Sequence, residues 1–232
     1  MKPVLLLIPG MLNDARVWQP VRDALAPVAD VRVADVSAGL DMPSTSAKVW
    51  DLLADVPLST PLVLAGFSMG GYVAIDMVAC PQRPVQALAL LSTSARPEAP
   101  EGRLQREKTI AAMQANFPKV VEGLLQWNTH QASPTLLSMM RQMMLDVGAE
   151  VAVRQMRSIM SRADHRATLA QLQMPVRVLC GQHDRVTPPE LAQELATLIP
   201  AAQVHLIEGS GHMLPLEQSE QVIKHLKALL TH

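Results

Sequence analysis

Leu62-Val-Leu-Ala-Gly-Phe-Ser-Met-Gly-Gly71 is an apolar run that breaks at a glycine-rich turn and leads directly into Tyr72-Val-Ala-Ile-Asp-Met-Val-Ala79. This pattern predicts a buried strand, a tight turn and a helix, with the hydroxyl of Ser68 raised at the turn. Ser68 then has a strained backbone, so the residues at 66 and 70 need to lack Cβ atoms, and both are glycine. The Gly-x-Ser-x-Gly pattern also occurs by chance in about one chain in ten of this size. By itself it therefore indicates a nucleophilic serine without establishing one.

Two later apolar runs end next to residues that a serine nucleophile needs. The run Val176-Arg-Val-Leu-Cys-Gly-Gln-His-Asp184 ends in an acid, and Val204-His-Leu-Ile-Glu208 passes through Gly209-Ser-Gly211 into His212. Along the chain the order is therefore serine, acid, histidine. The two main families of serine protease have other orders.

With this order, the sequence resembles the α/β-hydrolase superfamily over nearly its whole length. Among its subfamilies it is most similar to small carboxylesterases and acyl hydrolases with a helical cap, which are related to lactone hydrolases and C–C bond hydrolases. The motifs that carry the resemblance are Leu5-Leu-Leu-Ile-Pro-Gly10 with Trp18, Gly66-Phe-Ser-Met-Gly-Gly71, Gly181-Gln-His-Asp184 with Thr187-Pro-Pro189, and Gly211-His-Met-Leu-Pro-Leu-Glu217.

The resemblance implies a role for each of these residues. Ser68 is the expected nucleophile, His212 the base that takes its proton, and Asp184 the acid that orients the histidine ring. The superfamily binds the oxyanion with two backbone N–H groups, which correspond here to those of Met69 and Met11. The N–H group of Leu12 is the alternative to that of Met11.

Alternating apolar strands and helices predict an α/β fold with a mostly parallel sheet of about six strands. The superfamily usually has eight, and the first two have no counterpart here. The expected strands span 4–8, 31–36, 62–67, 87–92, 176–181 and 203–207, and the expected helices span 14–27, 45–55, 69–80, 189–198 and 215–230. The alternation stops between about 98 and 172, where helical segments are expected at 103–115, 118–126, 134–145, 150–162 and 163–172. Residues 98–172 thus resemble the superfamily's helical cap, inserted into a core formed by 1–97 and 173–232.

Methionine is concentrated in and around the expected cap. Its flexible, polarizable side chain suits the lining of an apolar acyl pocket, but ordinary packing of helices onto the core is the preferred explanation for most of these positions. The residues that we expect to contact substrate are Leu12, Trp18, Met140 and Met213, with a structural role beneath the oxyanion loop as the alternative for Trp18. Arg162 and His165 either face a polar group of the substrate or belong to a local ion-pair network.

Composition excludes several classes of partner. The chain has 232 residues, 49% of them hydrophobic, and a formal net charge of −1. No basic run indicates nucleic acid or an anionic membrane, and no apolar segment approaches the roughly 20 residues of a membrane span. The apolar stretch from Val4 to Ile8 is shorter than the roughly 7 to 15 apolar residues of a signal sequence, so a cytoplasmic location is expected. The expected oligomeric state is a monomer or a homodimer. Cys80 and Cys180 are expected to be free, buried thiols.

The sequence therefore predicts a serine hydrolase that cleaves a small to medium carboxylic ester and needs no metal or other cofactor. A metal site formed by His183, Asp184 and His212 is a poor alternative, because the spacing matches no known ligand motif. Lactonase, thioesterase and C–C bond hydrolase activity use the same three residues and stay open. A ligand receptor without catalytic activity is the alternative from another class, since a fold does not determine a function.

Overall fold

The computed structural model describes residues 2–231 and contains one parallel sheet of six strands. The strands lie side by side in the order β2-β1-β3-β4-β5-β6. This arrangement confirms the predicted α/β-hydrolase fold and its number of strands. Their bounds are β1 Val4–Ile8, β2 Asp30–Val33, β3 Leu62–Phe67, β4 Ala87–Leu91, β5 Val176–Gly181 and β6 Ala202–Ile207.

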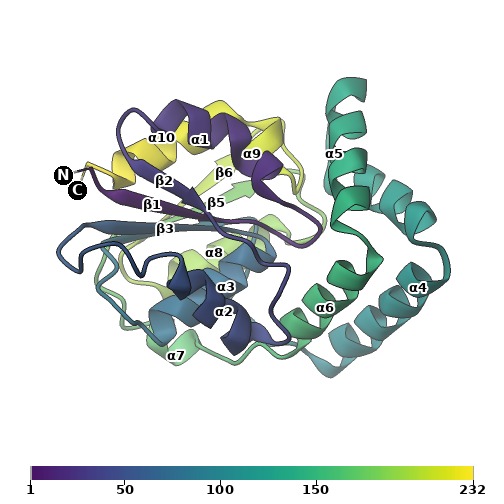
Figure 1. The fold of residues 1–232 in the computed structure, drawn as a ribbon, viewed down its shortest axis with the longest axis horizontal. Coiled ribbons are helices and arrows are strands. Elements are labelled where there is room, and N and C mark those ends of the chain that lie inside the picture. Colours follow the sequence, from purple (N-terminus) through teal and green to yellow (C-terminus); the bar gives the residue numbers. More distant parts are fainter. Residues whose placement is uncertain (1, 232) are drawn as a thin grey trace.

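Helices cover both faces of the sheet (Figure 1), which explains why the central strands are apolar at every position. Alternate residues of β1 enter different cores: Leu5 and Leu7 face one, and Leu6 and Ile8 face the other. The first face packs against the 3-10 helix η1 Ala15–Trp18 and the helices α1 Gln19–Leu25, α9 Leu214–Glu217 and α10 Ser219–Leu229. The second packs against α2 Met42–Asp51, α3 Met69–Ala79, α7 Arg166–Leu169 and α8 Pro189–Leu198.

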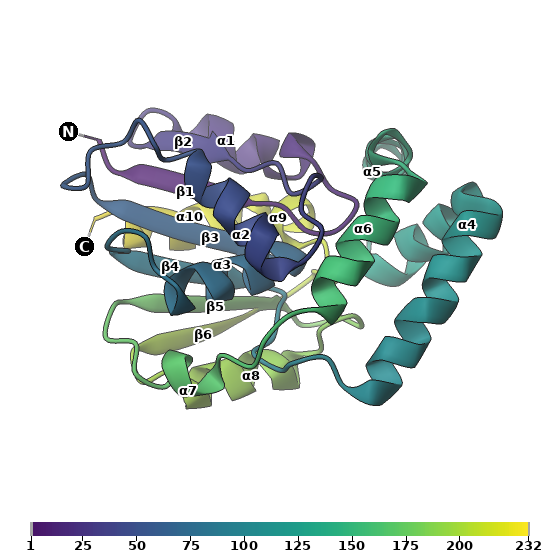
Figure 2. The ribbon, with the colours of Figure 1, turned by 60° about the horizontal axis from the view of Figure 1, so that its bottom comes forward.

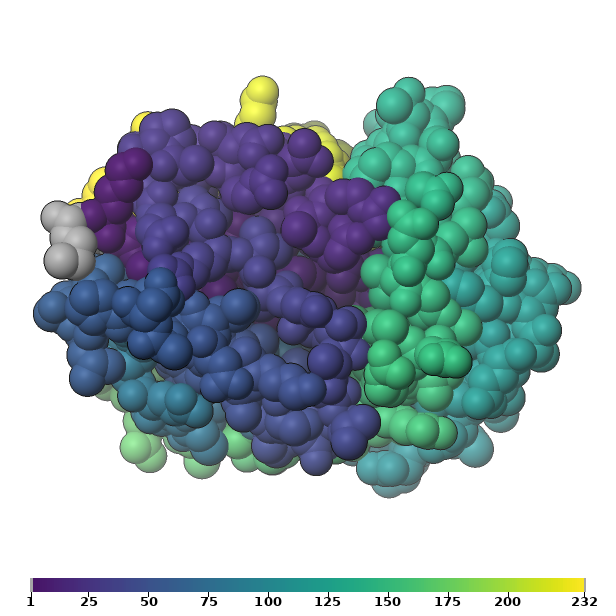
Figure 3. Space-filling view, in the orientation of Figure 1, coloured from purple at the N-terminus to yellow at the C-terminus, as the bar shows by residue number. Residues whose placement is uncertain are grey.

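Three further helices lie together beside the carboxyl edge of the sheet (Figures 1 and 2). They are α4 Pro100–Asn128, α5 Pro134–Val147 and α6 Ala149–Met160, and we call them the cap. In the space-filling view, the surface of α6 adjoins that of the N-terminal residues of the core (Figure 3). The buried apolar residues of the cap, except Ile159, form one continuous cluster with those on the α1 and α10 face of the sheet.

The helix α4 contains a kink that the sequence explains. Asn116 has non-helical backbone angles (φ −156°, ψ 81°), two residues before Pro118, and its Oδ1 accepts a hydrogen bond from the N–H of Lys119 at 3.2 Å. Proline lacks an N–H and disfavours the helical conformation just before it. The two helices expected at 103–115 and 118–126 are therefore the two halves of α4.

Two expectations from the sequence are wrong. The helix expected at 163–172 is reduced to the four residues of α7, which packs against α3 of the core. Cys180 is buried on β5 as expected, but Cys80 is exposed. The backbone of Cys80 leaves the helical conformation (φ −125°, ψ 65°) at the end of α3, and the chain turns there toward the surface.

No helix within residues 2–231 has the length and apolar character that crossing a membrane requires.

Two histidines and an arginine meet where β5, β6 and α10 pack together. Arg177 Nη1 lies 2.8 Å from Nδ1 of His225 and 3.3 Å from Nε2 of His205, and the centres of the two rings are 4.1 Å apart. The arginine donates, so each histidine accepts through an unprotonated nitrogen. Burial, together with the neighbouring charges of His205, Arg177 and Lys224, lowers the pKa of His225 to about 4. Burial and Arg177 also lower the pKa of His205.

These two histidines predict a loss of stability in mild acid. In the unfolded chain a histidine binds its proton near pH 6.5, whereas folded His225 does so only near pH 4. The free energy of unfolding should therefore fall as the pH drops from about 6.5 to about 4. We expect His225→Gln to reduce the difference in Tm between pH 7 and pH 4.5 by a few degrees.

Thermal denaturation at a series of pH values measures this effect. His183→Gln, which replaces an exposed histidine, is the matched control and should follow the wild-type curve. A His225→Gln protein that loses as many degrees in acid as the wild type would contradict the prediction.

Candidate active site

Ser68 lies at the turn between β3 and α3 in the strained conformation expected from the sequence. Its backbone angles are φ 53° and ψ −115°. A Cβ atom at Gly66 would be 2.3 Å from the carbonyl oxygen of Gly70, and one at Gly70 would be 2.1 Å from that of Ile8. The N–H of Ser68 donates to Leu91 O at 2.9 Å. The turn is therefore held by neighbouring strands and closes only because two side chains are missing.

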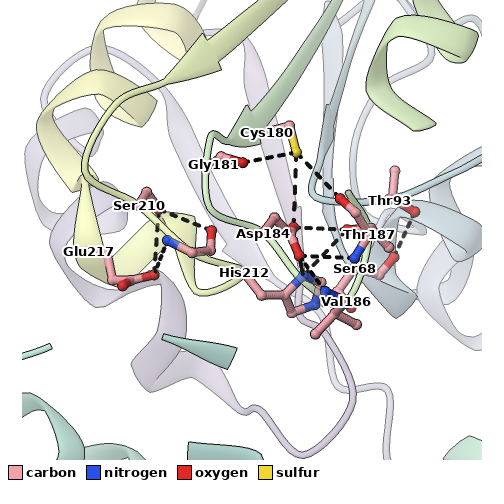
Figure 4. Close-up of polar contacts among 11 residues, drawn as sticks. Ser68, Thr93, Cys180, Gly181, Asp184, Val186, Thr187, Ser210, His212 and Glu217 are labelled. Carbon is pink, nitrogen blue, oxygen red and sulfur yellow. Dashed lines mark hydrogen bonds and ion pairs between the residues drawn. The ribbon is translucent and has the colours of Figure 1, made fainter. Parts of the chain in front are cut away.

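The structure brings Ser68, His212 and Asp184 together, although they are far apart in the sequence (Figure 4). Ser68 Oγ is 2.8 Å from His212 Nε2, and His212 Nδ1 is 2.9 Å and 3.0 Å from the two carboxylate oxygens of Asp184. An ionised carboxylate can only accept hydrogen bonds, so His212 Nδ1 must carry the hydrogen of its contact with Asp184. The opposite nitrogen, Nε2, is then free to accept the hydroxyl proton of Ser68.

The carboxylate of Asp184 is almost completely buried, and several donors surround it. The backbone N–H groups of Val186 and Thr187 donate to Oδ1 at 2.8 Å and 2.9 Å, and Thr187 Oγ1 donates to Oδ2 at 2.9 Å. Burial alone would raise the pKa of Asp184. The nearby His212 and the two backbone donors outweigh that effect, and the pKa of the carboxyl lies below its usual value. Asp184 is therefore ionised at neutral pH.

Cys180 lies behind this carboxylate on β5, with its Sγ 4.0 Å from Asp184 Oδ2. Burial and the charge of Asp184 raise the pKa of the thiol to about 12. Since the thiolate is the reactive form of cysteine, Cys180 is inert as a nucleophile at neutral pH.

The loop that carries His212 is held from two sides. Glu217 Oε2 accepts a hydrogen bond from the N–H of Gly211 at 3.0 Å (Figure 4). The carbonyl oxygen of Asn128, at the end of α4, accepts from the N–H groups of His212 and Met213 at 2.8 Å and 3.2 Å. The histidine is thus attached both to the core and to the cap.

Three backbone N–H groups are candidates for the oxyanion hole. Those of Met11 and Met69 donate to no acceptor within residues 2–231. Met69 begins α3, where N–H groups have no partner inside the helix. The N–H of Leu12, in contrast, donates to Gln155 Oε1 at 2.9 Å. The two N–H groups without an acceptor are therefore those of Met11 and Met69, which the resemblance implies as the oxyanion donors.

The residues predicted to contact substrate belong to a single apolar cluster. This cluster also contains Phe67, whose ring centre lies 5.3 Å from that of His212 and 6.4 Å from that of Trp18. Leu12, Trp18, Met140 and Met213 are each at most 1% exposed. They belong to the same cluster as Phe67, and their contact with substrate stays a prediction.

Arg162 and His165 form a local network, which was the alternative to a substrate contact. Arg162 Nη1 bonds to the carboxylate of Glu98, and its guanidinium lies 4.6 Å from the centre of the Tyr72 ring. His165 Nε2 is 3.0 Å from Asp76 Oδ1. Both side chains already have partners in the protein.

His183 does not join Asp184 and His212 in a cluster of ligands. Its ring stacks on that of His130, with centres 3.7 Å apart. Within residues 2–231, no three side chains of His, Cys, Asp or Glu are grouped so that they could bind a metal ion.

Sequence reasoning missed the residues that support the site, including Gln155, Asn128, Glu217 and Arg185. Glu217 stood inside a recognised motif, but its contact with the loop at 210–211 was not predicted. For Gln155 and Asn128 the sequence offers no signal, because their contacts join distant parts of the chain.

A model of the alpha/beta hydrolase family matches residues 5–225. The chain belongs to this family. The hydrolase is 28% identical over 96% of its length to the biotin biosynthesis bifunctional protein BioHC of Cellvibrio japonicus, of which it spans 46%. It is 29% identical over 97% of its length to the pimeloyl-[acyl-carrier protein] methyl ester esterase of Xanthomonas oryzae, of which it covers 94%.

Among solved structures, the hydrolase resembles a thermophilic esterase from Thermogutta terrifontis. The TM-score is 0.88 and the identity 28%, with 100% of this chain and 90% of that chain covered. The similarity therefore extends over the cap as well as the core.

The close contact at Gly70 predicts a large loss of stability on adding a single methyl group. In Gly70→Ala the new Cβ meets the backbone oxygen of Ile8, which cannot rotate away. We expect the free energy of unfolding to fall by at least about 2 kcal/mol and Tm by about 4–8 °C.

Gly123→Ala is the matched control, since Gly123 lies in α4 with nothing within 4 Å of the added Cβ. Alanine favours the helix, so this variant should be as stable as the wild type or up to about 1 kcal/mol more stable. Equal melting temperatures for Gly70→Ala and Gly123→Ala would refute the steric account of the turn.

Proposed function

We propose that the protein is a serine hydrolase that cleaves a small to medium carboxylic ester through an acyl-enzyme. The observation that carries this proposal is the continuous line of contacts from Ser68 Oγ through His212 to Asp184, each of 3.0 Å or less. A hydroxyl, an imidazole and a buried carboxylate in this order are what acyl transfer at neutral pH requires.

In the proposed reaction, Ser68 Oγ attacks the carbonyl carbon of the ester while His212 Nε2 takes its proton. The negative charge that forms on the carbonyl oxygen is stabilised by the N–H groups of Met11 and Met69. The intermediate then expels the alcohol, which receives the proton from His212, and leaves the acyl group on Ser68. Water attacks this acyl-enzyme with His212 again as base, which releases the acid and restores the serine.

Asp184 supports both steps without taking a proton itself. It holds the Nδ1–H of His212 and stabilises the positive charge of the ring when Nε2 is protonated. Its low pKa and its backbone donors keep it ionised throughout.

The surroundings of the site favour an apolar acyl group. Six methionines of the cap share the apolar cluster of Phe67 and Met213, namely Met113, Met140, Met143, Met144, Met156 and Met160. Methionine adapts its shape to an entering ligand more readily than branched side chains do. The relative from Xanthomonas is named a pimeloyl-[acyl-carrier protein] methyl ester esterase, and its pimeloyl group supports an acyl group of medium length.

The first test is labelling of the purified protein with a fluorophosphonate, followed by peptide mapping and by turnover of p-nitrophenyl esters. Label is expected on Ser68. Ser68→Ala and His212→Ala should each lower kcat by about five to six orders of magnitude, and Asp184→Asn by about four.

Ser92→Ala is the matched control. Ser92 is also buried at the end of a strand and has a positive φ of 46°, but its hydroxyl has no partner within the described residues. This variant should keep the wild-type rate. A Ser68→Ala protein with half the wild-type activity, or label on another residue, would end the proposal.

A substrate series then tests the nature of the acyl group. With p-nitrophenyl esters from acetate to decanoate, each added methylene that is buried should raise kcat/KM about fourfold, which corresponds to about 0.8 kcal/mol, until the pocket is filled. We expect an optimum at medium length, and turnover of a pimelate methyl ester.

Lactones, thioesters and a C–C diketone are assayed in parallel, because they need the same three residues. A lactone or thioester that reacts tenfold faster than every ester would reassign the activity. Tight binding of an ester without turnover or labelling would instead indicate a receptor.

A further inference from the structure

Gln155 is a buried polar residue of the cap that contacts the loop of the oxyanion hole. It lies on α6, is 2% exposed, and makes two hydrogen bonds to the core. Its Oε1 accepts from the N–H of Leu12 at 2.9 Å, and its Nε2 donates to the carbonyl oxygen of Val36 at 3.3 Å. The residues it joins are 143 and 119 positions away in the chain.

The contact with Leu12 acts on one particular peptide group. The carbonyl of Met11 and the N–H of Leu12 belong to the same planar unit. Gln155 holds its N–H end, and Asn13 Nδ2 holds its C=O end at 2.7 Å. The Met11–Leu12 peptide is therefore fixed at both ends, by one side chain from the cap and one from the loop itself.

This peptide needs such support because its conformation is strained. Leu12 has a φ of 60°, in the left-handed region that a leucine rarely occupies. Rotation of the peptide plane would relieve the strain by returning φ of Leu12 to negative values. The same rotation would reverse the directions of the Met11 C=O group and the Leu12 N–H group within the loop.

We propose that Gln155 is a positioning residue for the oxyanion hole, a role that rests on the proposed hydrolase function. It holds the Met11–Leu12 peptide so that the N–H of Met11 stays free to bind the oxyanion while that of Leu12 is occupied. Without Gln155, the loop relaxes and the oxyanion loses a well-directed donor.

The same face of α6 provides a matched control. One turn after Gln155, Ser158 Oγ lies 3.2 Å from Thr45 Oγ1, and Ser158 is 1% exposed. Ser158 thus also joins the cap to the core by a buried hydrogen bond, but to α2 and not to the oxyanion loop. Ser158→Ala weakens the attachment of the cap without touching Leu12.

The test compares wild type, Gln155→Met and Ser158→Ala in ester hydrolysis and in binding of an alkyl boronic acid. Boronic acids form a tetrahedral adduct with the serine and so report on stabilisation of the transition state. Methionine keeps the size of glutamine but accepts no strong hydrogen bond. We expect Gln155→Met to lower kcat and boronate affinity together by about 10- to 100-fold with KM nearly unchanged, because misdirecting a donor costs less than the 100- to 1000-fold of deleting one.

Ser158→Ala should stay within about threefold of wild type in both measurements. Equal losses in Gln155→Met and Ser158→Ala, or a Gln155→Met enzyme with wild-type kcat and boronate affinity, would overturn the role of Gln155. These outcomes are read only against a wild type that hydrolyses esters. A wild type that neither turns over esters nor takes the fluorophosphonate label refutes the proposed function instead.

Gln155→Asn is the second variant, for the case that Gln155→Met does not fold. It keeps the carboxamide, but its side chain is one methylene shorter and its oxygen no longer reaches the N–H of Leu12. A loss of at least fivefold in kcat and in boronate affinity, at a melting temperature near that of wild type, is expected. Wild-type values in folded Gln155→Asn protein would overturn the proposal.

Discussion

The close approach of the first turn of α3 to the ends of β1 and β3 is the constraint on which the candidate site depends. It places the backbone of Gly70 against the carbonyl of Ile8, and that of Gly66 against Gly70. No residue with a side chain fits at either position. The same approach leaves Ser68 at the tip of the turn and the N–H of Met69 at the start of the helix, beside the residues that follow β1. The proposed nucleophile and the proposed oxyanion donors are thus positioned by one packing contact.

The cap supports three of the loops near this turn. Gln155 of α6 holds Leu12, and the carbonyl of Asn128 at the end of α4 holds the backbone of His212. Arg185, next to Asp184, donates to the carbonyls of Gln126 and Thr129 at 2.6 Å and 3.3 Å and stacks over Trp127. The end of α4 therefore links the acid loop to the histidine loop. The cap is therefore part of the scaffold of the candidate site.

The sequence was sufficient for the fold because the strands are continuous apolar runs and the turn at Ser68 has a single geometry. Five of the six strands appear within one residue of the predicted bounds, whereas β2 ends at Val33, three residues before the predicted end at 36. The predicted ends of elements were wrong where packing against the rest of the protein determines them. The segment 163–172 has helical composition, yet only Arg166–Leu169 is helical where it meets α3. Cys80 was predicted to be buried because it follows an apolar helix, but that helix ends just before it. The order and spacing of the motifs identified Ser68, Asp184 and His212. The contacts of Gln155, Asn128 and Arg185, in contrast, join segments whose proximity no local sequence pattern encodes.

An isolated carboxylate in an apolar interior would take up a proton, yet Asp184 is buried and has a lowered pKa. Oδ1 accepts two backbone N–H groups and Oδ2 accepts the hydroxyl of Thr187, so these donors replace the water that burial removes. They also fix the carboxylate so that it faces His212 Nδ1. In the proposed reaction the histidine gains the serine proton, and its positive charge forms beside a fixed negative charge in a place with little water, where the attraction is strong. Without these donors, a protonated Asp184 would offer no such charge. The loop from Asp184 to Thr187 is thus as necessary to the proposed chemistry as the carboxylate it holds.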